Sequence, residues 1–263
     1  YASRWQIETV IKKYSNHIPF PIFLHYEGTR YEGEGDKKKE IKEPKTEQIN
    51  AASAIWKRPK SELKDEDYNE FYKSISHDMD EPLLWSHVHA EGKLDYTTLF
   101  FVPKHAPFDL FRADYNPGVK LYVKRVFITD DDKELMPVYL RFVRGIIDSE
   151  DLPLNVSREI LQQNRILAKI KASSVKRILD ELSKLQKNDR EKYNEFYKEF
   201  GIPIKEGLYQ DYENRDALLE LVRFKSTKAD GITSLEEYVG RMKPDQSAVY
   251  YITGEREHNL RES

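Results

Sequence analysis

The chain has 263 residues, a net charge of −3 and no cysteine. This near balance of charge lacks the basic excess that non-specific nucleic-acid binding requires, so we expect no nucleic-acid partner. The absence of cysteine excludes disulfides and thiolate metal sites. No apolar run reaches the roughly 20 residues of a membrane helix, and no signal peptide is visible. We therefore expect a cytoplasmic protein without membrane contact.

The first part of the chain combines helical and strand-like patterns. Apolar residues spaced along 5–14 predict an opening helix, and the apolar run 20–26 predicts a strand. Residues 27–47 are rich in Gly, Lys and Glu and predict a loop or hairpin tip. Aromatic residues in 68–75 recur at helical spacing, which predicts a second helix with Asp65 as its N-cap.

Two strands and one more helix are expected next. Residues 94–102 predict one strand, and residues 119–129, where apolar residues alternate with Lys and Tyr, predict another. Apolar residues between 139 and 146, with Pro137 near the start, predict a helix. Strands interleaved with helices indicate an α/β layered fold.

Helical patterns dominate the C-terminal part. A long helix is predicted to end near Leu185, and an aromatic stripe over 193–200 predicts a second helix, which Gly201 and Pro203 end. Residues 218–222 predict a third helix.

The last 30 or so residues predict one helix and one strand. Ser234 and Glu237 form a capping box before an apolar helix, and residues 248–253 read as a strand. One helix and one strand cannot bury a core alone. Because the chain starts at Tyr1 without a methionine and stops at Ser263 just past this segment, we expect it to be a fragment.

The stretch from Asp148 to Asn164 is the most informative in the chain. A loop containing Pro153 runs into the predicted long helix, and Arg158 stands in the first turn. A cation there opposes the helix dipole unless an anion lies beside it. Gln162, four residues on, lies on the same face, so the two side chains predict a phosphate-binding pair. A plain surface arginine is the alternative that spacing alone leaves open.

Other chemical signals are weaker. His87 and His89 have a strand-like metal spacing, but no third ligand can be named, and surface histidines are the simpler interpretation. Residues 28–35 lack the Gly-Lys-Ser/Thr ending of a phosphate loop, and no nucleophile motif occurs. We expect no metal site and no nucleotide site within the chain.

The stretch 148–164 closely resembles the catalytic loop in the middle domain of the heat-shock protein 90 chaperone family. The resemblance runs from about residue 82 to the end of the chain, and is looser before that. Its further motifs lie at residues 106–111, 120–129, 221–227 and 250–255. Residues 50–60 and 82–87 are more similar to the bacterial, HtpG-type branch than to the eukaryotic one.

The resemblance implies an α/β fold with three parts. Residues 1–186 would form a larger α/β sandwich domain that ends in the long helix. Residues 187–232 would form a small helical connector. Residues 233–263 would be the truncated beginning of a second, smaller α/β domain.

The resemblance also implies a role in ATP hydrolysis within a chaperone that assists the folding of client proteins. Arg158 would reach ATP held in a separate N-terminal domain and stabilise its γ-phosphate, with Gln162 as a supporting contact. Asn155 would orient the loop, unless it is only a turn or cap residue. Phe127 would dock the loop against the nucleotide domain, and core packing is its alternative.

A client-binding surface is expected around four apolar residues. Trp85, Phe108 and Phe111 lie in or near Pro-containing loops, a neighbourhood that the family exposes to unfolded clients. Met79 stands where eukaryotic relatives commonly carry Trp. Capping of the core is the alternative for the three aromatic residues, and the change from Trp to Met at position 79 puts the client contact there in doubt.

The expected cofactors and partners follow from the same resemblance. Mg and ATP would bind the N-terminal domain, and a C-terminal domain would form the homodimer of the parent protein. The chain by itself would be a monomer without ATPase activity. The alternative is a non-catalytic scaffold, whose Arg158 loop binds a partner's carboxylate or phosphate. A self-contained phosphotransfer enzyme is disfavoured because the phosphate loop and metal ligands are missing.

Overall fold

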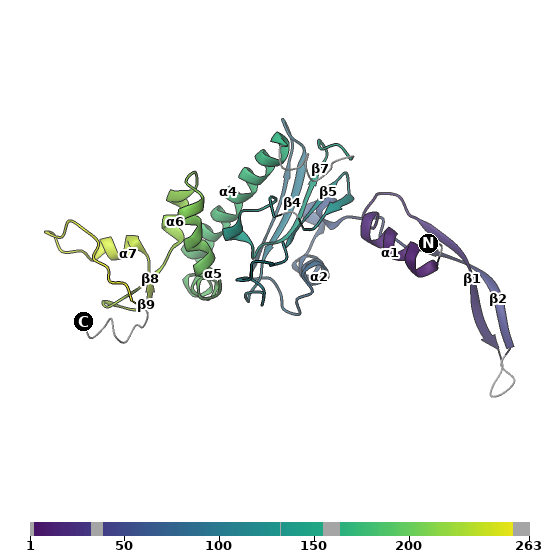
Figure 1. Cartoon of the computed structure of the whole chain (residues 1–263), viewed down its shortest axis with the longest axis horizontal. Coiled ribbons are helices and arrows are strands. Elements are labelled where there is room, and N and C mark those ends of the chain that lie inside the picture. The colour runs from purple at the N-terminus through teal and green to yellow at the C-terminus, as the bar shows by residue number, and fades with distance from the viewer. Residues whose placement is uncertain (1–2, 33–38, 132, 155–163, 255–263) are drawn as a thin grey trace. The chain divides into compact units, whose positions relative to one another are not determined.

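The computed structural model describes residues 3–32, 39–131, 133–154 and 164–254 (Figure 1). The chain divides into two compact units. Unit 1 comprises Tyr1–Val102, Asn116–Leu135 and Val143–Ile170, and unit 2 comprises the rest of the chain. The α/β class predicted from the sequence is confirmed. The predicted domain borders at residues 186 and 232 stay a prediction.

Unit 1 is built on a five-stranded sheet with strand order β3-β4-β7-β5-β6. Its strands are β3 (Leu84–Ala90), β4 (Tyr96–Val102), β5 (Val119–Val123), β6 (Val126–Thr129) and β7 (Arg144–Ser149). Neighbouring strands are antiparallel, except that β5 and β7 are parallel. The central strand is β7, and its neighbour β4 is buried along its whole length.

One helix and a short 3-10 turn complete the core of unit 1. The helix α2 (Asp65–Ser76) packs against the sheet (Figure 1). It buries Tyr68 and Tyr72. The turn η2 (Ile55–Lys57) buries Trp56 in the same cluster. Asp65 is not the N-cap, because Lys64 holds that position, and its backbone N–H donates to Asp67 Oδ2 at 2.9 Å.

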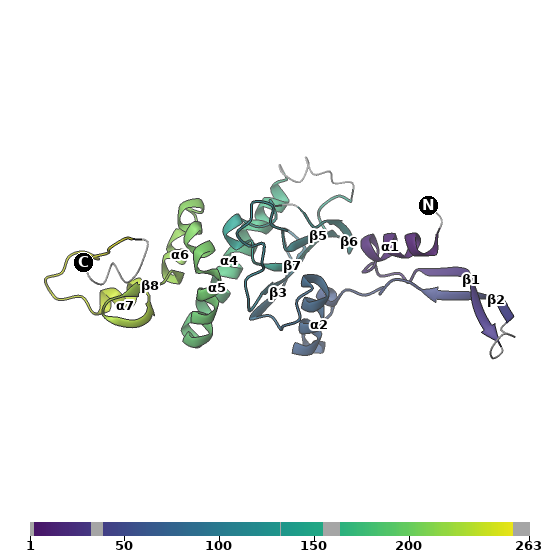
Figure 2. The same cartoon turned by 60° about the horizontal axis from the view of Figure 1, so that its bottom comes forward.

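The N-terminal part of unit 1 is a helix followed by a two-stranded ribbon (Figure 2). The helix α1 (Arg4–Tyr14) agrees with the prediction, and β1 (Phe23–Glu32) pairs antiparallel with β2 (Lys39–Gln48). The predicted loop over residues 27–47 is therefore mostly strand. The described side chains of this ribbon are largely exposed or half-exposed, so its composition resembles that of a loop.

The helix predicted between residues 139 and 146 is wrong. A short 3-10 turn, η4 (Val138–Leu140), is followed directly by β7. A short and fully buried apolar run has no periodicity that separates strand from helix. Gly145 adopts a φ of +142°, and a Cβ there would lie 2.1 Å from the Leu99 carbonyl oxygen, so β7 approaches β4 closely.

The single strand predicted over residues 119–129 is two strands. Lys124 and Arg125, with φ of 51° and 66°, turn the chain between β5 and β6. This tight hairpin returns β6 along β5 and leaves β6 at the edge of the sheet.

Helices form most of unit 2. α4 (Arg165–Asn188) enters it from unit 1, and α5 (Arg190–Gln210) and α6 (Arg215–Leu221) follow. The predicted end of the second helix at Gly201 is wrong, because α5 continues through Pro203. An internal proline costs about 3 kcal/mol relative to alanine. Its flanking residues Phe200 and Ile204 are fully buried, and this packing outweighs the local preference.

Unit 2 ends with β8 (Phe224–Ser226), β9 (Ala229–Thr233) and α7 (Leu235–Gly240). The predicted capping box is confirmed, since the Glu237 N–H donates to Ser234 Oγ at 3.0 Å and the Ser234 N–H donates to Glu237 Oε2 at 2.9 Å. The strand predicted over residues 248–253 is wrong. Among the described residues it finds no partner strand to complete its hydrogen bonds.

Candidate functional site

A fully buried carboxylate lies at the point where β7 enters the loop predicted to be catalytic. Asp148 Oδ2 accepts a hydrogen bond from Trp56 Nε1 at 2.8 Å, and Oδ1 accepts one from the Arg125 N–H at 3.1 Å. Lys57 Nζ lies 3.7 Å from Oδ2. Burial raises the pKa of Asp148, and the two hydrogen bonds and the Lys57 charge act against this rise. One side chain thus joins η2, the β5–β6 turn and the end of β7.

The residues that follow Asp148 are held as well. Lys57 Nζ contacts Glu150 Oε1 at 2.7 Å, and the Asp95 N–H donates to Asp151 Oδ2 at 2.7 Å. Ser149 Oγ accepts hydrogen bonds from the N–H groups of residues 151 and 152, both at 3.2 Å. The first part of the loop, up to the buried Leu152, is therefore fixed to the body of unit 1.

The long helix α4 begins at Arg165. The helix start predicted at Arg158 lies outside the described residues. Asn164 is outside the helix, and its Oδ1 accepts hydrogen bonds from the N–H groups of Ile166 and Leu167 at 2.9 and 3.2 Å. An asparagine in this arrangement is an N-cap, so it marks the N-terminal boundary of the helix. The predicted site residues Asn155, Arg158 and Gln162 lie outside the described residues.

Phe127 is a core residue of the β5–β6 hairpin. Only 8% of it is exposed, and its ring makes edge contacts with Tyr14 and Tyr122 at centroid distances of 5.8 and 5.7 Å. Lys13 Nζ lies 5.9 Å from the ring centroid. Core packing thus accounts for Phe127, and its part in docking the loop stays a prediction.

The four residues expected to bind clients differ in exposure. Met79 and Phe108 are 88% and 94% exposed, whereas Phe111 is 59% exposed. Trp85 is half-buried, and its ring stacks on that of Tyr68 at a centroid distance of 4.0 Å. Met79 and Trp85 belong to unit 1, and the two phenylalanines belong to unit 2.

The two histidines of β3 do not form a metal site. His87 is buried between the Tyr68 hydroxyl at 2.9 Å and the Trp56 carbonyl at 3.0 Å, so its interpretation as a surface residue is wrong. Burial lowers the pKa of His87. His89 pairs with Thr97 and Glu91. In the part of the chain that the structure describes, no group of three potential ligands converges, and no helix is long and apolar enough to cross a membrane.

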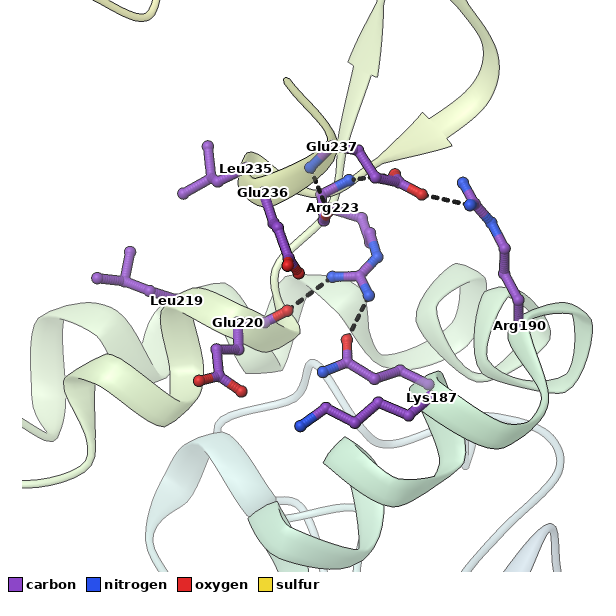
Figure 3. A pocket seen from close by; sticks show the side chains of 10 residues that line it. Lys187, Arg190, Leu219, Glu220, Arg223, Leu235, Glu236 and Glu237 are labelled. Carbon is purple, nitrogen blue, oxygen red and sulfur yellow. Dashed lines mark hydrogen bonds and ion pairs between the residues drawn. The ribbon is translucent and has the colours of Figure 1, made fainter. Parts of the chain in front are cut away.

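A pocket of about 520 Å³ in unit 2 was not anticipated from the sequence (Figure 3). Both of its arginines contact groups within unit 2. Arg190 pairs with Glu237, and Arg223 donates to Gln186 and to the Glu220 carbonyl. Arg223 also lies over the Tyr193 ring, 4.8 Å from its centroid. The pocket is therefore lined by α7 and by the helices α4, α5 and α6, and we assign no catalytic role to the residues that line it.

The sequence patterns did not predict which residues contact the start of the loop. Trp56 and Lys57 lie 92 and 91 positions before Asp148, and no local pattern connects them. Only pairing of the distant strands brings η2 beside the end of β7.

The comparisons with known proteins agree with this architecture. A family model described as Hsp90 protein matches residues 27–263. The chain is 65% identical over its full length to the chaperone protein HtpG of Treponema denticola, of which it covers 41%. It is 64% identical over 97% of its length to HtpG of Helicobacter acinonychis, again covering 41%.

A solved structure is also similar. The middle domain of a heat shock protein from Plasmodium falciparum matches with a TM-score of 0.71 and 33% identity, over 80% of this chain and 82% of that one. The chain thus spans about 41% of the length of the curated relatives, and the part that it spans has the fold of a middle domain. The chain belongs to the Hsp90 protein family, as a middle domain of the HtpG-type branch.

Proposed function

We propose that this chain is the part of an ATP-dependent cytoplasmic chaperone, active in the stress response, that completes the ATPase site. Arg158 and Gln162 contact the γ-phosphate of an ATP held, with Mg, in a separate N-terminal domain, and Asn155 orients their loop. The resemblance of residues 148–164 to the family's catalytic loop supports these roles. The observation that carries the proposal is that the described residues on both sides of 155–163 are held in place.

The physical argument concerns rigidity. A guanidinium stabilises the charge on a transferring phosphoryl group only if it is held in position before the reaction. Asp148 anchors one side of the segment, and Asn164 caps the helix on the other. Fixing both described flanks lowers the entropy that is lost when the segment between them contacts a neighbouring domain.

The same proposal includes a client surface. The exposed side chains of Met79, Phe108 and Phe111 are apolar, and large exposed apolar groups are what recognition of unfolded chains requires. The half-buried Trp85 contributes as well. In the parent protein, a C-terminal domain forms the homodimer.

The test of the catalytic role is the steady-state ATPase activity of the full-length protein with Arg158→Ala. We expect kcat to fall at least about tenfold, which corresponds to roughly 1.4 kcal/mol of transition-state stabilisation, with little change in KM. Arg177→Ala is the matched control, since Arg177 is a half-exposed arginine in the middle of α4 that pairs with Glu181 one turn away. A kcat equal to that of wild type would refute the catalytic role and favour the scaffold alternative.

A further inference from the structure

The loop that carries Phe108 and Phe111 is attached to the rest of unit 2 by a buried arginine. This segment, residues 106–111, is called the aromatic loop below. Arg141 Nε donates to the Leu110 carbonyl at 2.6 Å, and its side chain is only 6% exposed. Leu110 itself is 2% exposed, whereas Phe108, two residues earlier, is 94% exposed. The loop thus points one apolar side chain inward and one outward.

Arg141 is in turn held by an ion pair and by its own turn. Its Nη1 lies 2.6 Å from Glu206 Oε2, and its Nη2 lies 3.2 Å from Glu206 Oε1, so the two planar groups meet at two points. The same Nη1 donates to the Val138 carbonyl at 2.9 Å. The guanidinium lies 5.7 Å from the Phe111 ring centroid. A buried cation bound on several sides has little freedom to move.

A second carboxylate of α5 holds the start of the loop. Glu199 Oε2 accepts a hydrogen bond from the Ala106 N–H at 2.8 Å, and its Oε1 lies 3.8 Å from His105 Nδ1. Glu199 and Glu206 are seven residues apart, which is about two helical turns, so both lie on one face of α5. This alignment exists only because α5 continues through Gly201 and Pro203.

We propose that Arg141, paired with Glu206, is the positioning residue of the aromatic loop. It holds Leu110 inward and so presents Phe108 in a fixed conformation to apolar segments of a client. Arg141 is too buried to touch a client itself. This inference rests on the proposed client surface and adds what makes that surface rigid.

The physical reason is preorganisation. A loop that must be ordered on binding loses part of the interaction free energy to that ordering, whereas a clamped loop does not. The charges of the neighbouring residues 104–114 nearly cancel, with Lys104 and Arg112 against Asp109 and Asp114. The recognition that remains is apolar, as an unfolded segment requires.

The experiment uses the full-length protein and a fluorescently labelled, reduced and carboxymethylated lactalbumin as a permanently unfolded probe. In Arg141→Met, we expect faster backbone hydrogen exchange in residues 106–112 and a probe Kd raised roughly three- to tenfold, the effect of ordering a few side chains on binding. Arg141→Lys should show an intermediate effect, because one ammonium cannot occupy the positions of all the guanidinium donors. Arg112→Met is the control, since Arg112 pairs with Asp114 and both side chains are more than half exposed.

A second variant covers the outcome in which Arg141→Met does not fold. Glu206→Gln keeps the bond from Arg141 to the Leu110 carbonyl and removes only the charge of its partner, so loop exchange should rise by less. Unchanged exchange in residues 106–112 in both folded variants would overturn the inference. A second result would also overturn it: Arg141→Met speeds exchange in the aromatic loop but leaves the probe Kd unchanged, while Phe108→Ser weakens probe binding.

Phe108→Ser also separates the two proposals. If this change leaves the probe Kd unaltered, the client surface is wrong, and Arg141 is then judged by loop exchange alone. If Phe108→Ser weakens binding but the Arg141 variants do not, only the positioning role is lost.

Discussion

Asp148 illustrates at the level of a single residue how the fold supports the site. Its carboxylate is completely buried, and it accepts hydrogen bonds from two segments that are distant in sequence. Burying an isolated charge is costly, but here the donors Trp56 and Arg125 and the nearby Lys57 compensate for the lost water. The residue therefore holds these segments together only as long as both of its oxygens accept these hydrogen bonds.

We expect Asp148→Asn to destabilise the protein by about 2–3 kcal/mol, the usual cost of leaving a buried donor facing another donor. The amide nitrogen would face either the Trp56 or the Arg125 N–H. Urea unfolding followed by tryptophan fluorescence measures this change, because Trp5, Trp56 and Trp85 all belong to unit 1. Asp180→Asn, on the exposed side of α4, should change stability by less than about 0.5 kcal/mol. Equal stability of the two variants would contradict this account of Asp148.

At the level of the element, α5 is the clearest case in which packing overrides local preference. Gly201 lies in its interior, where glycine is normally unfavourable, and a Cβ there would be 2.7 Å from the Tyr197 ring. Tyr197 cannot easily move away, because its hydroxyl donates to the Arg223 carbonyl at 3.1 Å. The glycine therefore allows the ring to pack directly against the helix backbone.

Gly201→Ala should consequently lower stability by about 1–3 kcal/mol, as overpacking does, although alanine is the better helix former. Gly240→Ala in α7 is the matched control, since nothing lies within 4 Å of its Cβ position. That change should raise stability by about 0.4–1 kcal/mol. Chemical unfolding followed by circular dichroism gives both values. If Gly201→Ala raises stability instead, the Tyr197 ring moves aside without cost and the account is wrong.

Asp211, the C-cap of α5, should make the free energy of unfolding depend on pH. Partial burial acts to raise the pKa of Asp211, but hydrogen bonds from Tyr139 at 2.7 Å and from Asn214 outweigh it, and the pKa is lowered. A lowered pKa in the folded state means that the contribution is present above the ordinary value of about 4 and is lost as the pH falls further. The stability difference between wild type and Asp211→Asn should therefore shrink as the pH falls from 6 to about 3. A difference that stays constant would exclude Asp211 as the source.

At the scale of the whole molecule, the chain covers only about 41% of the length of its curated relatives. We expect that the isolated chain is a monomer and hydrolyses no ATP, because its sequence lacks a phosphate-binding loop. Addition of the separate N-terminal nucleotide domain should produce hydrolysis that depends on Arg158. Sedimentation and a coupled ATPase assay test both expectations, and saturable turnover by the chain alone would contradict the second.

Sequence patterns alone predicted the α/β class and most helices, and the loop motif indicated the family. The amphipathic patterns of α1, α2 and α6 and the capping box at Ser234 are local signals, which act within one or two turns. The loop motif from Asp148 to Asn164 is local as well. These features could be read without knowing what lies across the core.

Features that depend on contacts between residues distant in sequence could be identified only from the tertiary structure. Residues 144–149 form a strand because β4 and β5 lie on either side, and α5 passes through Pro203 because its buried face is packed on both sides of the proline. The contacts of Asp148 with Trp56 and of Arg141 with Leu110 join positions 92 and 31 residues apart. Such contacts leave no periodic trace in the sequence, because their energy comes from burial and hydrogen bonding that exist only once the chain has folded.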